Sequence, residues 1–288
     1  MATRLPEDAQ RTAESRTEPS EETLMETGYA PVNGVDMYWE SRGSGGTPLI
    51  VVHGGFGLTT LFGGPVDELA DQRQVISIEL QGHGHTRDID RPFSFEGFGD
   101  DIAALARYLD LGQVDLLGCS LGGGATLRAT IQHPDLVRRL ALVSVPCRRT
   151  GWFPSVLAGM DQISAAGFDM MRQTPMYAAW AAVAPDPDAF PTLMDRTGTL
   201  LRQPYDWTDE VRSITTPTLL VYADADSIPT SHIAEIFGRL GGGLADGDWD
   251  GSSPTRMRLA ILPNTTHYNV FASPRIGGVV AEFLSDKS

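Results

Sequence analysis

Cysteine and positive charge are both scarce in this chain of 288 residues. Its two cysteines, Cys119 and Cys147, are too few for a disulfide framework and favour a reducing, cytoplasmic compartment. Its 22 Lys and Arg residues stand against 37 Asp and Glu residues, which gives a formal net charge of −15. Nucleic acids and anionic membrane surfaces are bound through basic patches, so neither is expected as a partner.

Long apolar runs are also missing from the sequence. No run approaches the roughly 20 residues that a membrane-spanning helix needs, and no basic segment followed by an apolar stretch marks a secretory signal peptide. Residues 1–27 are polar, and a segment of this composition buries too little apolar surface to offset its ordering entropy. We therefore predict a disordered N-terminal tail, followed by one large domain that carries an insertion.

From Tyr29 onward, short apolar runs alternate with segments of helical periodicity. Residues 35–40 alternate like a half-buried strand, whereas the other runs are continuously apolar, as in strands buried on both faces of a parallel sheet. These runs are residues 49–52, 75–78, 114–117, 140–143, 218–221 and 259–262. The helical segments are residues 98–109, 121–133, 233–240 and 275–284. The alternation predicts an α/β fold with a doubly wound, mostly parallel sheet, whose functional residues gather at the carboxyl ends of the strands.

Residues 146–216 interrupt this alternation and are rich in Trp, Met, Phe, Ala and Pro. We predict a helical cap over residues 147–212, inserted into a core formed by residues 28–146 and 213–288. Aromatic and Met side chains at helical spacing pack first of all on one another, but a subset of them would line an apolar substrate pocket. Trp152 and Trp180 are our candidates from the cap.

The run at residues 114–117 leads into Gly118-Cys119-Ser120-Leu121-Gly122, and a helix-forming segment follows. The bare Gly-x-Ser-x-Gly pattern is usually only a loop, but between a strand and a helix it is typical of a nucleophile elbow. A side chain at Gly118 or Gly122 would collide with neighbouring backbone in so sharp a turn. The adjacent helix N-terminus favours developing negative charge. Ser120 is therefore the predicted nucleophile.

A serine hydroxyl needs a base to take its proton and an acid to orient that base. His267 lies just past the last predicted strand, at the sheet edge where Ser120 is expected, and is our candidate base. Asp224 and Asp226 both follow the penultimate strand, and either could be the acid. Asp226 is preferred because it lies further into the turn.

An oxyanion hole needs two backbone N–H groups that point at one place. The residue after the nucleophile, Leu121, supplies the first. The second should come from the glycine-rich loop after residues 49–52, where Gly55 is the first candidate and Phe56 the next. Phe56 and Cys119 are also candidates for contact with substrate.

At this point the sequence resembles the α/β-hydrolase superfamily, from about Val32 to the C-terminus. The motifs that carry the resemblance are His53-Gly54-Gly55, Glu79 to Thr86, Gly118 to Gly122, Asp226 with Pro229, and Thr266-His267. It implies Ser120 as nucleophile, Asp226 as acid and His267 as base, with Gly55 and Leu121 as oxyanion donors. It also implies a cap and no metal or organic cofactor. Glu79 and Cys119 depart from the family, which usually has Asp and a His or aromatic residue there.

The activity expected from this site is hydrolysis of a carboxylic ester of a small, largely apolar molecule through an acyl-enzyme. Cleavage of a lactone, amide, thioester or C–C bond fits the same residues. A Ser rather than an Asp nucleophile argues against epoxide hydrolase and dehalogenase chemistry. An alternative from another class is a receptor-like binding module that keeps the triad but turns over slowly or not at all.

Overall fold

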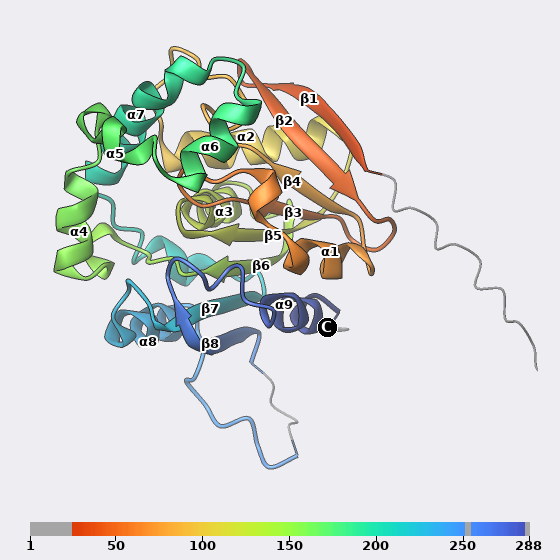
Figure 1. Ribbon diagram of the computed structural model, residues 1–288. Coiled ribbons are helices and arrows are strands. Elements are labelled where there is room, and N and C mark those ends of the chain that lie inside the picture. Colours follow the sequence, from red (N-terminus) through yellow and green to blue (C-terminus); the bar gives the residue numbers. More distant parts are fainter. Residues whose placement is uncertain (1–24, 251–254, 286–288) are drawn as a thin grey trace, which may run out of the picture.

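The computed structural model describes residues 25–250 and 255–285, and these fold around one eight-stranded sheet (Figure 1). The strand order across the sheet is β1-β2-β4-β3-β5-β6-β7-β8. The pairs β1–β2 and β2–β4 are antiparallel, and all the other pairs are parallel. The strands are β1 Glu26–Val32, β2 Val35–Arg42, β3 Leu49–Val52, β4 Val75–Ile78, β5 Val114–Cys119, β6 Val137–Val143, β7 Thr218–Ala225 and β8 Met257–Thr266.

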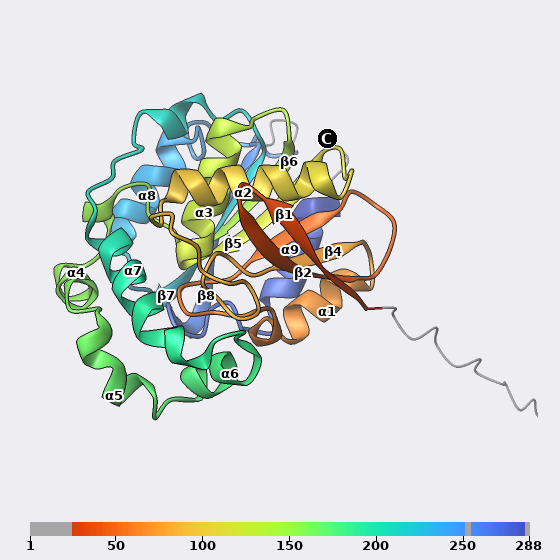
Figure 2. The ribbon, with the colours of Figure 1, turned by 90° about the horizontal axis from the view of Figure 1, so that it is seen from above.

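Helices cover both faces of the sheet. On one face, α2 (Phe95–Tyr108) and α3 (Ser120–Gln132) lie side by side, and α8 (Thr230–Arg239) joins the same core (Figure 2). On the other face, α1 (Gly64–Ala70) packs against α9 (Ile276–Ser285). Consecutive strand residues point to opposite faces, so Leu116 lies in the first core and Leu117 in the second. This two-sided burial explains why the strands are continuously apolar.

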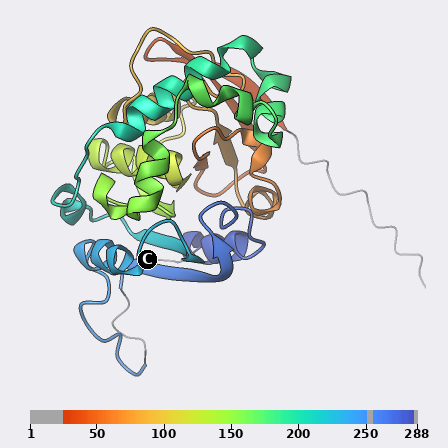
Figure 3. The same cartoon turned by 60° about the vertical axis from the view of Figure 1, so that its left-hand side comes forward.

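The chain between β6 and β7 is helical and contains α4 (Pro154–Asp161), α5 (Phe168–Met171), α6 (Pro175–Val183) and α7 (Phe190–Arg202). These helices lie together on one side of the molecule, remote from α9 (Figure 3). Phe190 at the start of α7 packs on Phe56 in the loop after β3, with 5.8 Å between ring centroids. Trp180 on α6 donates a hydrogen bond to the Gly82 carbonyl, in the loop after β4. The insertion therefore lies against the carboxyl ends of the strands.

The fold confirms every predicted strand and helix of the core, with ends that differ by a few residues. Two elements were missed. Strand β1 pairs with β2 through a two-residue turn at Asn33 and Gly34, whose φ angles of 50° and 87° are those of a hairpin turn. The Asn-Gly pair is the sequence signal that would have found it. Helix α1 is short, and its seven residues gave no clear helical period.

Residues 1–24 of the predicted disordered tail lie outside the described residues. For residues 26 and 27 the prediction was wrong, because they belong to β1 and pair with β2. Across the part of the chain that the structure describes, none of the helices is both long and apolar enough to cross a membrane.

Candidate active site

Ser120 lies at the sharp turn between β5 and α3, with a left-handed φ of 52°. The two flanking glycines make this turn possible. A Cβ atom on Gly118 would stand 2.3 Å from the Thr126 hydroxyl oxygen, and one on Gly122 would stand 2.2 Å from the His53 carbonyl oxygen. Both distances are well inside van der Waals contact. The structure thus confirms the steric argument for glycine on each side of Ser120.

His267 and Asp226 lie next to Ser120 in a continuous hydrogen-bonded row. The His267 Nε2 atom is 3.0 Å from the Ser120 hydroxyl oxygen, and its Nδ1 atom is 3.2 Å from an Asp226 carboxylate oxygen. The Asp226 side chain is only 1% exposed and that of His267 11% exposed. In this arrangement the imidazole can accept the serine proton while the buried carboxylate holds the ring by its other nitrogen.

The Asp226 carboxylate accepts two further hydrogen bonds on its other oxygen. The Ser144 hydroxyl donates to it at 2.5 Å, and the backbone N–H of Ala223 donates at 2.9 Å. Burial by itself would raise the pKa of Asp226, but the hydrogen bonds from His267, Ser144 and Ala223 hold it below its usual value. Asp226 is therefore a fixed negative charge against the imidazole.

Asp224, the other carboxylate considered for this position, is exposed and points elsewhere. It accepts hydrogen bonds of 3.0 Å from the backbone N–H groups of Asn264 and Thr265, which lower its pKa. These bonds fasten the end of β8, just before His267, to the end of β7. The structure thus brings Asp226 to His267 and gives Asp224 a different set of partners.

Ser144 is the site residue that sequence reasoning missed. It follows β6, is fully buried and has a left-handed φ of 55°, an uncommon conformation for a residue with a side chain. Its backbone N–H donates to the Val221 carbonyl, so the strained conformation is held by the sheet. The available signal was its position: Ser144 ends a predicted strand at the same sheet edge as Ser120.

A cavity of about 60 Å³ opens beside Ser120. Its lining includes the three residues considered for the oxyanion hole, Gly55, Phe56 and Leu121. From the insertion it includes Trp152, Met160, Thr197, Leu201 and Tyr205. The Trp152 ring also packs edge-on against the His267 ring, with centroids 5.1 Å apart. The insertion thus supplies one wall of the cavity beside Ser120.

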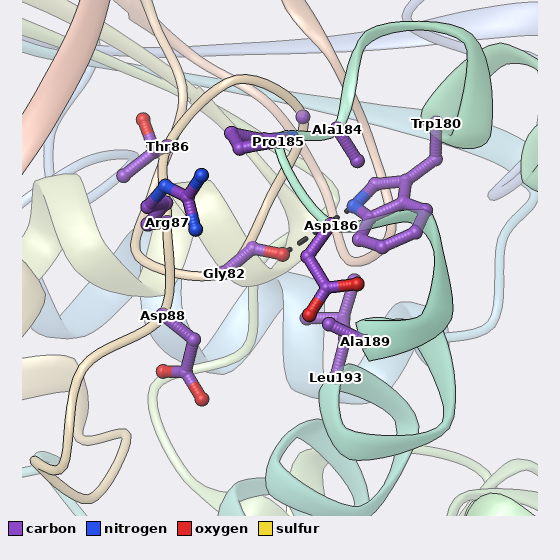
Figure 4. Close-up of a pocket in the computed structure, with 11 residues that line it drawn as sticks. Gly82, Thr86, Arg87, Asp88, Trp180, Ala184, Pro185, Asp186, Ala189 and Leu193 are labelled. Atoms are coloured by element: carbon purple, nitrogen blue, oxygen red, sulfur yellow. Dashed lines mark hydrogen bonds between the residues drawn. The ribbon is translucent and has the colours of Figure 1, made fainter.

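Two of the four predicted pocket residues do not line this cavity. Cys119 points to the opposite core, because β5 alternates its side chains between the two faces, and burial raises the pKa of its thiol to about 12. Trp180 lines a separate cavity of about 130 Å³ with Arg87, Asp88 and Pro185 (Figure 4). Its indole packs on Phe190 and reaches the Gly82 carbonyl, and these contacts direct it away from Ser120.

The buried His53 connects the glycine-rich loop to the loop after β4. Its Nε2 atom accepts a hydrogen bond from the Leu80 N–H at 3.1 Å, and its Nδ1 atom is 2.7 Å from the Gly54 carbonyl oxygen. Burial and the neighbouring His83 lower the pKa of His53 to about 3, so the ring is neutral. Its contacts position the loop that carries Gly55.

Comparisons with known proteins bear on the fold that carries this site. A family model described as alpha/beta hydrolase fold matches residues 47–242. The chain covers only about a third of the length of several curated relatives. One of these is the dihydrolipoyllysine-residue acetyltransferase component of an acetoin cleaving system from Pseudomonas putida. It is 36% identical over 123 residues, which make up 40% of this chain and 31% of that protein.

Two further matches extend over most of the chain. A pimeloyl-(acyl-carrier protein) methyl ester esterase from Nitrosomonas europaea is 23% identical over 260 residues, 83% of this chain and 95% of that protein. Among solved structures, a thermophilic esterase from Thermogutta terrifontis has a TM-score of 0.68 at 20% identity, covering 91% of this chain and 98% of that one. At such identity the structural likeness concerns the fold.

Proposed function

Since the chain belongs to the alpha/beta hydrolase fold family, we propose that it is a serine hydrolase that cleaves a carboxylic ester of a small, largely apolar molecule. The observation that carries this proposal is the row of hydrogen bonds from Ser120 through His267 to Asp226. A row of this kind activates a serine for attack on a carbonyl carbon. The small cavity beside Ser120 supports a short substrate.

The proposed reaction has two halves. The Ser120 oxygen attacks the ester carbonyl carbon while its proton passes to His267 Nε2, and that proton then leaves with the alcohol as the C–O bond breaks. Water next gives a proton to the same nitrogen and attacks the acyl-enzyme, which releases the acid and restores Ser120. Asp226 keeps the ring oriented and stabilises its positive charge in both halves.

The oxyanion that forms in each half needs backbone donors. Leu121 is the second residue of α3, in the first turn, whose N–H groups have no partner within the helix. The N–H of Gly55 is the proposed second donor, from a loop that lines the same cavity. Two such donors, together with the N-terminal end of α3, favour the negative charge that develops on the carbonyl oxygen.

Burst kinetics with p-nitrophenyl acetate test this proposal. An acyl-enzyme mechanism predicts a rapid release of about one p-nitrophenol per protein molecule, followed by slower steady turnover. Acid quenching during the burst, with mass spectrometry of the digested protein, should find the acetyl group on the peptide that contains Ser120. Release without any acylated peptide contradicts the covalent mechanism, and binding without steady turnover supports a receptor-like module instead.

The Ser144 hydroxyl gives a further prediction, as a positioning residue for Asp226. Replacing Ser144 with Gly or Ala removes a hydrogen bond to a charged group, so we expect kcat to fall about tenfold or more with little change in KM. The two variants should differ in stability, because Gly accepts the left-handed conformation and Ala does not. We expect the free energy of unfolding of the Gly variant to be about 1 kcal/mol higher than that of the Ala variant.

Steady-state kinetics and urea unfolding of both variants check this prediction. A purely structural role for Ser144 would make activity follow stability, so that the Gly variant would be the more active of the two. If kcat falls equally in the more stable Gly variant and the less stable Ala variant, the loss is due to the missing hydroxyl. Wild-type kcat in both variants would contradict the positioning role.

A further inference from the structure

Thr197 carries a buried hydroxyl in the wall of the cavity that Ser120 also lines. It lies on α7, its side chain is fully buried, and it lines the same cavity as Ser120, together with Leu201 one turn further along the helix. Among the described residues, its Oγ1 atom finds no hydrogen-bond partner. An unpaired hydroxyl in such a place lowers the stability of the protein and needs an explanation.

Two other helical threonines among the described residues satisfy their hydroxyls within their own helix. Thr199, two residues further along α7, donates to the Asp195 carbonyl at 2.8 Å, and Thr130 on α3 donates to the Thr126 carbonyl at 2.9 Å. This backward hydrogen bond is the usual solution for a threonine inside a helix. Packing does not require the hydroxyl of Thr197 either, since valine has the same shape. The feature that sets Thr197 apart is its place in the cavity wall.

The surroundings of Thr197 limit what its hydroxyl can bind. Among the described residues, none that lines this cavity carries a formal charge. Most of the lining side chains are apolar, such as Phe95, Val145 and Met160, and the hydroxyl of Tyr205 is engaged by the Trp152 side chain. A single hydroxyl in apolar surroundings suits an uncharged oxygen, whereas a carboxylate or phosphate would remain without a counter-charge.

We propose that the Thr197 hydroxyl hydrogen-bonds an uncharged oxygen of the substrate, so that the preferred substrate is a short ester bearing a second hydroxyl, carbonyl or ether oxygen. This inference rests on the hydrolase function proposed above. It makes Thr197 a specificity-determining residue: its hydroxyl becomes paired only when a substrate with such an oxygen fills the cavity. An ester with a methylene group at that place leaves the hydroxyl unpaired. The protein should therefore hydrolyse it with a lower kcat/KM than the ester that has the oxygen.

Two pairs of esters of equal shape test the proposal with Thr197→Val. The first pair is p-nitrophenyl methoxyacetate and p-nitrophenyl butyrate. The methoxyacetate has an ether oxygen where the acyl chain of the butyrate has a methylene group. The second pair is 2-methoxyethyl acetate and butyl acetate. Here the alcohol part of the first ester has an ether oxygen where that of the second has a methylene group. The quantity measured is the ratio of kcat/KM within each pair, compared between wild type and variant, because intrinsic reactivity then cancels. We expect the ratio of at least one pair to fall about tenfold in Thr197→Val.

Stability and a matched variant complete the experiment. Thr197→Val removes an unpaired buried polar group, so its melting temperature should rise, whereas loss of a structural hydrogen bond would lower it. Thr199→Val, on the exposed side of the same helix, should leave both ratios at their wild-type values. Ratios that are the same in wild type and Thr197→Val for both pairs overturn the proposal. A wild type that hydrolyses none of the four esters overturns the hydrolase function itself, which is a separate result.

Discussion

Replacing Ser120 with Ala is expected to lower kcat for a p-nitrophenyl ester by about a millionfold and to abolish the burst. The loss is large because base, acid and oxyanion donors act on the nucleophile as a unit and achieve little without it. Alanine keeps the backbone strain that Ser120 already bears at its φ of 52°, so the melting temperature should remain close to wild type. Product release at equal rates from wild type and variant would rule out the proposed mechanism.

The neighbouring thiol provides a control for this prediction. Cys119 adjoins Ser120 in sequence, but its side chain lies in the opposite core, and burial raises the pKa of the thiol to about 12. A thiol in this state is not a nucleophile at neutral pH. Cys119→Ala should therefore retain the burst, and the double variant with Ser120→Ala should be no slower than Ser120→Ala alone. A further loss in the double variant would show that the thiol contributes.

Replacing Asp226 with Asn is expected to lower kcat by about 10⁴-fold at neutral pH. Asparagine fills the same space, but its amide N–H₂ can face His267 Nδ1 and then favours the tautomer that cannot accept the Ser120 proton. The negative charge that stabilises the imidazolium is lost as well. KM should change much less than kcat, because in the proposed mechanism Asp226 acts through His267 and does not contact the substrate.

Asp224→Asn is the matched comparison, two residues away and with the same change of chemistry. Asp224 is exposed and accepts hydrogen bonds from backbone N–H groups of the β8 end, so the expected loss of kcat is far smaller. The measurement is the steady-state kcat and KM of Asp226→Asn and Asp224→Asn under the same conditions. A large loss confined to Asp224→Asn would transfer the role of acid to Asp224.

Much of this site could be predicted because steric rules act over short stretches of sequence. Gly118 and Gly122 have no room for a Cβ atom, and the apolar run before them is a strand buried on both faces. Since parallel strands bring their carboxyl ends to one edge, residues that follow successive strands had to lie near one another. The same reasoning brought Asp226 and His267 to Ser120 without any knowledge of their contacts.

Contacts that depend on side-chain direction could not be predicted in this way. Trp180 and Cys119 were expected in the pocket, but the direction of Trp180 depends on how α6 packs against the core, and that of Cys119 on the alternation along β5. Ser144 was missed because nothing in the sequence tells a strained serine from an ordinary turn residue. Thr197 differs from Thr199 only in the helix face on which it lies, and that face is set by tertiary packing.

The three side chains of the hydrogen-bonded row and Ser144, which donates to Asp226, follow four neighbouring strands: Ser120 after β5, Ser144 after β6, Asp226 after β7 and His267 after β8. Within the described sheet, β8 is an edge strand that pairs with β7 alone, and the hydrogen bonds from Asn264 and Thr265 to Asp224 reinforce this pairing. Edge segments open locally at a lower free energy than central strands. The proposed proton acceptor, His267, is thus carried by a less protected part of the molecule than Ser120. In the proposed mechanism, brief fraying of this edge would interrupt catalysis while the rest of the protein stays folded.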